Sequence, residues 1–205
     1  LSSKKKLVNL DAISDVLDSP EAAEKAQAVA DRAVTLIRND RGVLPLSSSS
    51  RPCLIVITEL RISQFGQRTM QDFRRRAPGG RAVAIDTSQP LAAMEALAGD
   101  TGGCSAVVAA SFASVSADLK DAKPFLEKLS RGSAPLVLLP LENPYLLGSV
   151  PNAAAYLTTF SSSLPSEIAA VKALFGELSI TGHTPVSIPQ FAQLGDGIQL
   201  PARTR

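Results

Sequence analysis

The sequence predicts a three-layer α/β/α sandwich built around a mostly parallel sheet. Three observations lead to this fold class. Short apolar runs without polar alternation recur along the chain, as expected for strands that are buried on both faces. Helical patterns separate these runs, which is typical of βαβ units with right-handed crossovers. The 205 residues, 45% of them hydrophobic and 20% charged, suffice for one hydrophobic core and suit a folded protein.

The first predicted helix begins at Pro20. Ser19 suits the N-cap, proline suits the first helical position, and Glu21 lies in the first turn. Apolar side chains follow at helical spacing, and the face that they form is rich in alanine. We expect this helix to end near residues 39–42 and to pack closely on a flat partner such as a sheet. A short extended apolar segment and a flexible, serine-rich connection then lead to residue 51.

From residue 51 onward, strand-like and helical segments alternate. Apolar β-branched runs predict strands, and apolar residues at helical spacing, several of them closed by a glycine, predict helices. The expected strands are residues 54–58, 82–85, 106–110, 136–139, 154–158 and 186–188, and the expected helices are residues 67–76, 91–98, 124–129 and 166–175. This order predicts a flavodoxin-like domain over residues 19–189, with an interdomain linker before it (1–18) and a surface tail after it (190–205).

Cysteine and histidine are scarce in this sequence. Cys53 and Cys104 lie in apolar runs, and we expect both to be buried free thiols, because unpaired cysteine behaves as a small hydrophobic residue. Two cysteines exclude a disulfide framework, and one histidine excludes a histidine-rich metal site. That histidine, His183, stands in a turn, where we expect a solvated side chain and not a catalytic base.

Composition and motifs exclude several classes of function. The net charge of +2 argues against a strongly basic nucleic-acid-binding protein, and the run from Arg74 to Arg76 is expected to be a solvated helix end. No apolar run reaches the roughly 18 residues of a membrane span. The sequence has no glycine-rich dinucleotide loop, no phosphate-binding loop and no Gly-x-Ser-x-Gly motif. We therefore expect no metal and no cofactor, and we favour a subunit or accessory domain.

Polar side chains follow the predicted strands. The carboxyl ends of parallel strands share one edge of the sheet, and ligands bind there in open α/β sheets. Serine, asparagine and aspartate at such positions also cap helices and terminate strands, so a purely structural role stays open for each residue. The candidates for contact with a substrate or a partner domain are Glu59, Arg61, Ser111, Glu142, Asn143, Tyr145 and Ser161.

Four motifs, in order, resemble the C-terminal domain of family 3 glycoside hydrolases. Residues 26–40, followed by the Leu-Pro-Leu of residues 44–46, resemble the entry helix of that domain. The stretch from Leu174 to Pro189 resembles its closing motif, although His183 and Thr184 replace the usual Lys and Leu. The Asn-Pro-Tyr beginning at Asn143, and residues 156–161, resemble the β-N-acetylhexosaminidase-like branch. The resemblance extends over about residues 4–189.

The resemblance implies that the chain follows a (β/α)8 barrel in one polypeptide. In that family the barrel carries the Asp nucleophile, and the acid/base is an Asp-His pair on a barrel loop or, in the β-glucosidase branch, a Glu of the C-terminal domain. The implied parent enzyme is a retaining glycosidase that releases terminal β-linked N-acetylglucosamine or glucose. Its partners would be the barrel and the carbohydrate. We expect the chain alone to be inactive, because retaining hydrolysis needs two carboxyl groups across the scissile bond.

Two other hypotheses stay open. The chain could be a non-catalytic module that binds carbohydrate or protein, or a flavodoxin-like nucleotide-binding protein. Because the sequence begins with Leu1 and not with Met, we expect it to be part of a longer polypeptide. The residues leave the compartment open, and from the resemblance we expect a bacterial parent enzyme that is periplasmic or secreted.

Overall fold

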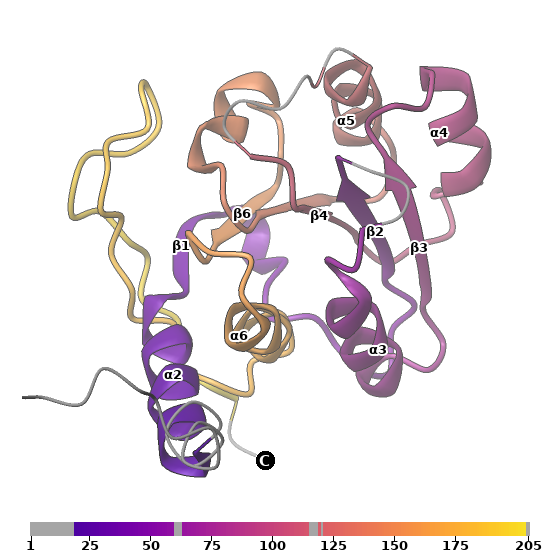
Figure 1. Ribbon diagram of the computed structural model, residues 1–205. Helices are drawn as coiled ribbons and strands as arrows, with labels where there is room; N and C mark the ends of the chain where they lie inside the picture. Colours follow the sequence, from indigo (N-terminus) through magenta and orange to yellow (C-terminus); the bar gives the residue numbers. More distant parts are fainter. Residues whose placement is uncertain (1–18, 60–62, 115–118, 120, 204–205) are drawn as a thin grey trace, which may run out of the picture.

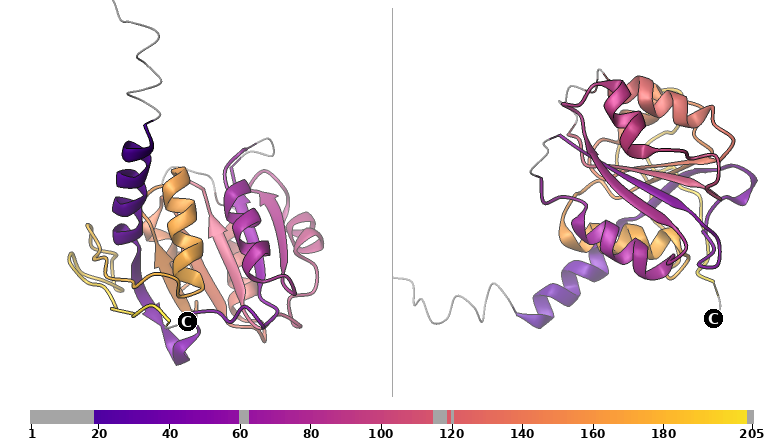
Figure 2. Two further views of the ribbon diagram at one scale, coloured as in Figure 1. Left: turned by 90° about the horizontal axis from the view of Figure 1, so that it is seen from below. Right: turned by 90° about the vertical axis from the view of Figure 1, so that its right-hand side faces the viewer.

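The computed structural model describes residues 19–59, 63–114, 119 and 121–203, and its centre is a six-stranded sheet with helices on both faces (Figures 1 and 2). The strands lie in the order β1-β6-β5-β4-β2-β3. They are β1 (Thr35–Asn39), β2 (Cys53–Thr58), β3 (Arg81–Asp86), β4 (Val107–Ser111), β5 (Leu136–Pro140) and β6 (Ala155–Thr158). All neighbours pair in parallel except β1, which is antiparallel to β6. The predicted sandwich with a mostly parallel sheet is confirmed.

Helices cover both faces of this sheet. They are α2 (Pro20–Ala33), α3 (Gln67–Arg76), α4 (Leu91–Ala98), α5 (Ala122–Ser130) and α6 (Leu164–Leu174). Successive residues of a strand point to opposite faces, so β2 contributes to two hydrophobic cores. Leu54 and Val56 share one core with Phe73 of α3, and Ile55 shares the other with Phe125 of α5. Burial on both faces explains why the central strands are apolar throughout.

The first helix differs from the prediction at its end. Its start is as expected, because the Ala22 N–H donates to Ser19 Oγ at 3.1 Å. The helix stops at Ala33, however, and the predicted continuation to residues 39–42 is wrong, since residues 35–39 form β1. This segment pairs with β6 as a strand of the sheet, although its apolar residues recur at helical spacing, because tertiary contacts override local propensity. Ala30 alone is buried among the residues of α2, so the helix projects beyond the sandwich and does not lie flat on the sheet (Figure 2).

The end of the chain also departs from the prediction. Residues 186–188 form no strand, because Ile188 N donates a hydrogen bond of 2.8 Å to Ala192 O across a tight turn. Residues 176–203, which we call the C-terminal strap, instead run along the outer edge of β1. Ile198 N donates to Leu36 O at 2.7 Å and Gly182 N donates to Val34 O at 3.2 Å. These bonds occupy the edge of β1 that β6 leaves open.

The cysteines form a disulfide, so the expectation of free thiols is wrong. Cys53 and Cys104 are bonded with a Cα–Cα distance of 5.7 Å and a sequence separation of 51 residues. Cys53 begins β2, whereas Cys104 lies in the turn before β4. Because β2 and β4 are neighbours and Cys53 N donates to Ala106 O at 2.9 Å, the two side chains meet. The pairing follows from strand order, which the residues alone do not reveal.

Two of the sequence predictions lie outside the described residues. These are the linker over residues 1–18 and the candidate site residue Arg61. Among the described residues, no helix has the length and apolar character to cross a membrane.

Candidate functional site

The carboxyl edge of the sheet carries a groove. It has a volume of about 840 Å³ and lies where the loops after β4, β5 and β6 meet the loop before α3. We call it the edge groove. Its lining residues are Phe65, Ser114, Glu142, Phe160, Ser161, Ser162 and Ser163.

Glu142 is the carboxylate that lines the edge groove. It lies just beyond β5 and is half-buried. Ser162, which follows β6, donates its hydroxyl hydrogen bond to Glu142 Oε1. The bond joins the loops of two neighbouring strands, so the carboxylate has a defined place at the groove wall. A positioned carboxylate beside several hydroxyl groups can accept and donate hydrogen bonds to a polyhydroxylated ligand.

Glu59 stands on a different loop. It is exposed after β2, and its Oε1 accepts a hydrogen bond of 2.6 Å from the Ser114 N–H. Ser114 lines the edge groove, so Glu59 holds in place one wall of the groove that contains Glu142. The two carboxylates are therefore bound to separate loops and have separate partners.

Two phenylalanines give the edge groove an apolar side. Phe65 is 49% exposed, and its ring stacks on the buried ring of Phe112 with centroids 6.0 Å apart. Phe160 has a φ of 56°, an unusual backbone conformation for a bulky residue. Neither residue was among the predicted candidates. The signal that could have found them is a large apolar side chain within a polar loop at a strand end.

Two of the remaining predicted residues, Asn143 and Ser111, have clear structural roles. Asn143 is buried, and its Oδ1 accepts a 3.0 Å hydrogen bond from Tyr145 N at the start of the short helix η2 (Pro144–Ser149). Ser111 is also buried at the end of β4, and its Oγ accepts from Ala113 N at 3.4 Å. Tyr145 is 43% exposed outside the groove lining, whereas Ser161 belongs to that lining.

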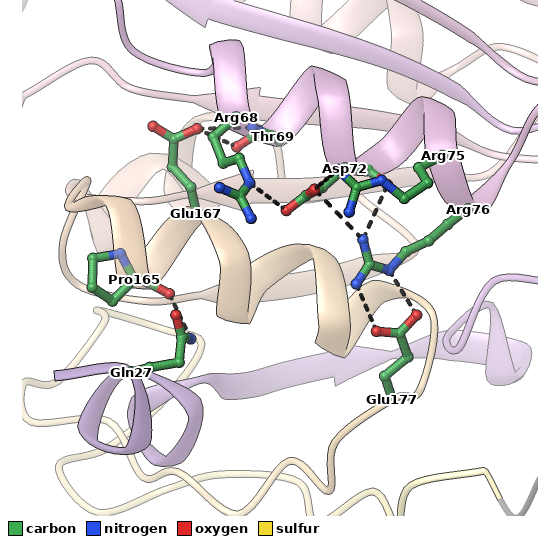
Figure 3. A network of polar contacts seen from close by, with 9 residues as sticks. All are labelled: Gln27, Arg68, Thr69, Asp72, Arg75, Arg76, Pro165, Glu167 and Glu177. Carbon is green, nitrogen blue, oxygen red and sulfur yellow. Dashed lines mark hydrogen bonds and ion pairs between the residues drawn. The ribbon is translucent and has the colours of Figure 1, made fainter. Parts of the chain in front are cut away.

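Glu167 of α6 is a buried carboxylate that the sequence did not single out. Its exposed fraction is 5%, and it lies against the first turn of α3 (Figure 3). Glu167 Oε2 accepts hydrogen bonds from Thr69 N at 2.9 Å and Thr69 Oγ1 at 2.8 Å, and Oε1 accepts from Gly66 N at 3.4 Å. Free N–H groups at a helix start attract negative charge, so Glu167 caps α3 from a different helix. This contact also fixes the backbone next to Phe65.

The arginines of α3 are only partly the solvated helix end that was predicted. Arg76 forms two hydrogen bonds to Glu177, Nε to Oε1 at 2.6 Å and Nη2 to Oε2 at 2.7 Å (Figure 3). This contact with Glu177 raises the pKa of Arg76. The buried Asp72 lies 2.8 Å from Arg68 Nε and 3.3 Å from Arg75 Nη2. The network thus connects α3 to the chain that follows α6.

A second depression, of about 740 Å³, lies between α4 and α5. Its charged side chains are already paired, Lys128 with Glu95 at 2.8 Å and Arg131 with Glu127 at 3.4 Å. Its lining residues belong to the two helices and to the turns that follow them, and not to the edge groove at the carboxyl ends of the strands, where open α/β sheets bind ligands. We therefore regard the edge groove as the candidate site.

His183, the one histidine of the chain, lies in an exposed turn. The His183 ring is exposed, with Nδ1 2.8 Å from Gly195 O, as expected for a turn residue. In the part of the chain that the structure describes, no group of three or more His, Cys, Asp or Glu residues could hold a metal ion.

The sequence matches no known family profile, and it matches no curated protein. Solved structures do match the fold. A family 3 β-N-acetylglucosaminidase from Paenibacillus sp. has a TM-score of 0.72 at 18% identity, over 93% of this chain and 36% of that one. A fungal multi-domain family 3 β-N-acetylglucosaminidase has a TM-score of 0.70 at 18% identity, over 93% and 21%. The β-glucosidase from Listeria innocua has a TM-score of 0.69 at 17% identity, over 90% and 29%.

In fold, the chain resembles the C-terminal domain of family 3 glycoside hydrolases. It spans between 21% and 36% of the length of the three enzymes. The TM-scores of the two β-N-acetylglucosaminidases and of the β-glucosidase differ by only a few hundredths. The family 3 C-terminal fold is therefore common to both activities and does not distinguish them.

Proposed function

We propose that the chain is the C-terminal accessory domain of a glycoside hydrolase whose catalytic groups lie in another domain of the same polypeptide. The observation that carries this proposal is the coverage of the structural matches. More than nine-tenths of this chain superimposes on about a third or less of two family 3 enzymes. A domain of that kind acts within a larger enzyme.

The edge groove is the surface that we propose to face the catalytic domain and its carbohydrate. Glu142 and the serines of the loop after β6 offer hydrogen-bonding groups, and the exposed ring of Phe65 offers an apolar face. A sugar ring presents hydroxyl groups at its rim and C–H groups on its faces, so this combination suits it. Glu59 would act indirectly, through its hydrogen bond to Ser114 N.

The substrate that we propose for the parent enzyme is a terminal β-linked N-acetylglucosamine, with glucose as the second candidate. Motifs around Asn143 and Tyr156 favour the first. Two of the similar structures are β-N-acetylglucosaminidases, and a third is a β-glucosidase.

The isolated chain should not hydrolyse either sugar. Retaining hydrolysis needs two carboxyl groups about 5–5.5 Å apart on opposite sides of the scissile bond. Among the described residues, Glu142 is the single carboxylate in the groove lining, and Glu59 is bound to another loop. One carboxylate cannot serve as both acid and nucleophile.

The test is a turnover measurement on the purified chain with nitrophenyl β-N-acetylglucosaminide and nitrophenyl β-glucoside. We expect no nitrophenol release above the rate in buffer, for the chain and for Glu142→Gln alike. Release that disappears in Glu142→Gln would show a complete active site in this chain and would contradict the proposal.

Titration calorimetry tests the non-catalytic alternative. Tight binding of chitooligosaccharides to the isolated chain, lost in a Phe65→Ala variant, would favour an independent carbohydrate-binding module. We expect no measurable heat, because an accessory domain supplies only part of a sugar site.

A further inference from the structure

Four exposed arginines gather near the edge of the sheet opposite the edge groove. Arg51 precedes β2, Arg81 begins β3, and Arg74 and Arg75 end α3. In a βαβ unit the connecting helix runs back from the carboxyl edge to the amino edge, so the end of α3 lies beside the starts of β2 and β3. We call these four residues the arginine face.

Three of these arginines have no carboxylate partner in the described part of the chain. Arg74 Nη2 donates to Ala82 O at 2.9 Å, and Arg81 Nη2 donates to Asp100 O at 3.0 Å. None of the ion pairs between described residues includes Arg51, Arg74 or Arg81. A main-chain carbonyl orients a guanidinium group but leaves its charge and most of its five N–H donors free.

The neighbouring carboxylates are already in use. Asp72 is 2% exposed and is shared by Arg68, Arg75 and Arg76. Arg76 occupies both carboxylate oxygens of Glu177. The charge that remains at the surface of this corner is therefore positive.

The whole chain has a net charge of only +2. The corner around α3 holds six guanidinium groups, those of the arginine face together with Arg68 and Arg76, against the four carboxylates Asp72, Asp100, Glu167 and Glu177. The surplus of positive charge at this corner equals the net charge of the whole molecule. Such an uneven distribution attracts an anionic partner to one face.

The geometry favours a polymer with repeated carboxylates. All four cations of the face are arginine, whose planar fork matches carboxylate oxygens in pairs. Arg74 and Arg81 are anchored at two separate carbonyls, that of Ala82 in β3 and that of Asp100 after α4, so their charges are spread out and do not converge on a single ion.

We propose that the arginine face binds an acidic polysaccharide. The choice of a polysaccharide rests on the proposed function, since an accessory domain of a glycosidase meets such polymers. The face and the edge groove lie at opposite edges of the sheet, so a polymer held on the face leaves the groove free.

The test is titration of the chain with polygalacturonate and with the same polymer after complete methyl esterification, which removes its charge. We expect binding to polygalacturonate that weakens steeply with added salt, and none to the ester. Arg74→Gln/Arg81→Gln should weaken binding about tenfold or more, since glutamine keeps an amide donor and removes the charge. The matched control is Lys128→Gln/Arg131→Gln on α5, which removes two exposed cations that have carboxylate partners.

Equal weakening by both double variants, or unchanged binding in Arg74→Gln/Arg81→Gln, would overturn the proposal. Binding to polyphosphate or to anionic phospholipid vesicles without binding to polygalacturonate would overturn it as well. Circular dichroism of each variant shows whether the fold is kept. Because binding is measured without hydrolysis, a chain that binds polygalacturonate and also hydrolyses the nitrophenyl sugars would contradict the proposed function and leave this proposal standing.

Discussion

At the scale of single residues, the structure separates side chains that hold the fold from those that face the edge groove. Asn143 and Ser111 were candidates for ligand contact, but both are buried and bonded to nearby main-chain N–H groups. Glu142 and Ser161 line the groove. Short polar residues after a strand can bond to the nearby main chain or face a ligand, and the sequence alone does not distinguish these two roles.

Glu167 should be important for stability. Replacing it by Ala leaves the Thr69 N–H and hydroxyl without a partner in a buried site. We expect a loss of about 1–3 kcal/mol in the free energy of unfolding. Urea denaturation of Glu167→Ala and Glu167→Gln measures this loss of free energy, and we expect the smaller loss in the Glu167→Gln variant. An unchanged urea midpoint in the Glu167→Ala variant would show that the cap contributes nothing to stability.

Tyr156 should make stability fall at high pH. Burial raises the pKa of its hydroxyl, which donates a 2.6 Å hydrogen bond to Pro144 O. The neutral form is therefore favoured in the folded state. This contribution to stability is fully present below the unfolded pKa of about 10 and is lost as the pH rises toward the folded value.

Urea midpoints between pH 8 and pH 11 test this for the chain and for Tyr156→Phe. The decline above pH 10 should be smaller in the variant, which cannot ionise at this position. Parallel curves would refute the assignment to Tyr156. The exposed Tyr145→Phe is the matched control and should follow the parent curve.

At the scale of elements, the helices and strands with a strong local pattern were predicted well. The predicted bounds of α3 and α4 agree with the structure, because glycines flank or end them and their apolar residues recur at helical spacing. The failures were β1 and residues 186–188. β1 depends on β6, a partner distant in sequence, whereas residues 186–188 enter a local turn in which Ile188 bonds to Ala192.

The disulfide joins the starts of β2 and β4 and encloses α3, β3 and α4. Closing a loop of 51 residues should stabilise the fold by about 4 kcal/mol through the unfolded chain. Dithiothreitol should therefore lower the urea midpoint of the chain and leave that of Cys53→Ala/Cys104→Ala unchanged. No effect of the reductant on the chain would mean that the two thiols are not paired in solution.

The C-terminal strap should keep β1 from pairing with other molecules. Ile198 N donates to Leu36 O, and Ile180 pairs with Leu200. Deleting the residues after 195 removes these bonds and exposes a strand edge, which promotes association. Size-exclusion chromatography should show larger species for the shortened chain. A monodisperse profile identical to that of the full chain would argue against this role.

At the scale of the whole molecule, the sequence predicted the layer architecture, and it predicted the polar edge only in outline. Alternating apolar runs and helices determine the sandwich, since each run must be buried on both faces. The edge groove needed the structure, because its wall combines loops from distant parts of the chain, such as Glu142 with Ser162 and Glu59 with Ser114. The apolar ring of Phe65 was missed for the same reason.

The central proposal is that this chain is an accessory domain of a glycoside hydrolase and does not supply the nucleophile. A retaining nucleophile forms a covalent glycosyl intermediate, and a fluorinated glycoside with a good leaving group traps it. The most direct measurement is the intact mass of the chain after incubation with such fluorinated analogues of the β-glucoside and the β-N-acetylglucosaminide. We expect the mass to stay at 21.5 kDa. The addition of one glycosyl group to a carboxylate of this chain would contradict the proposal.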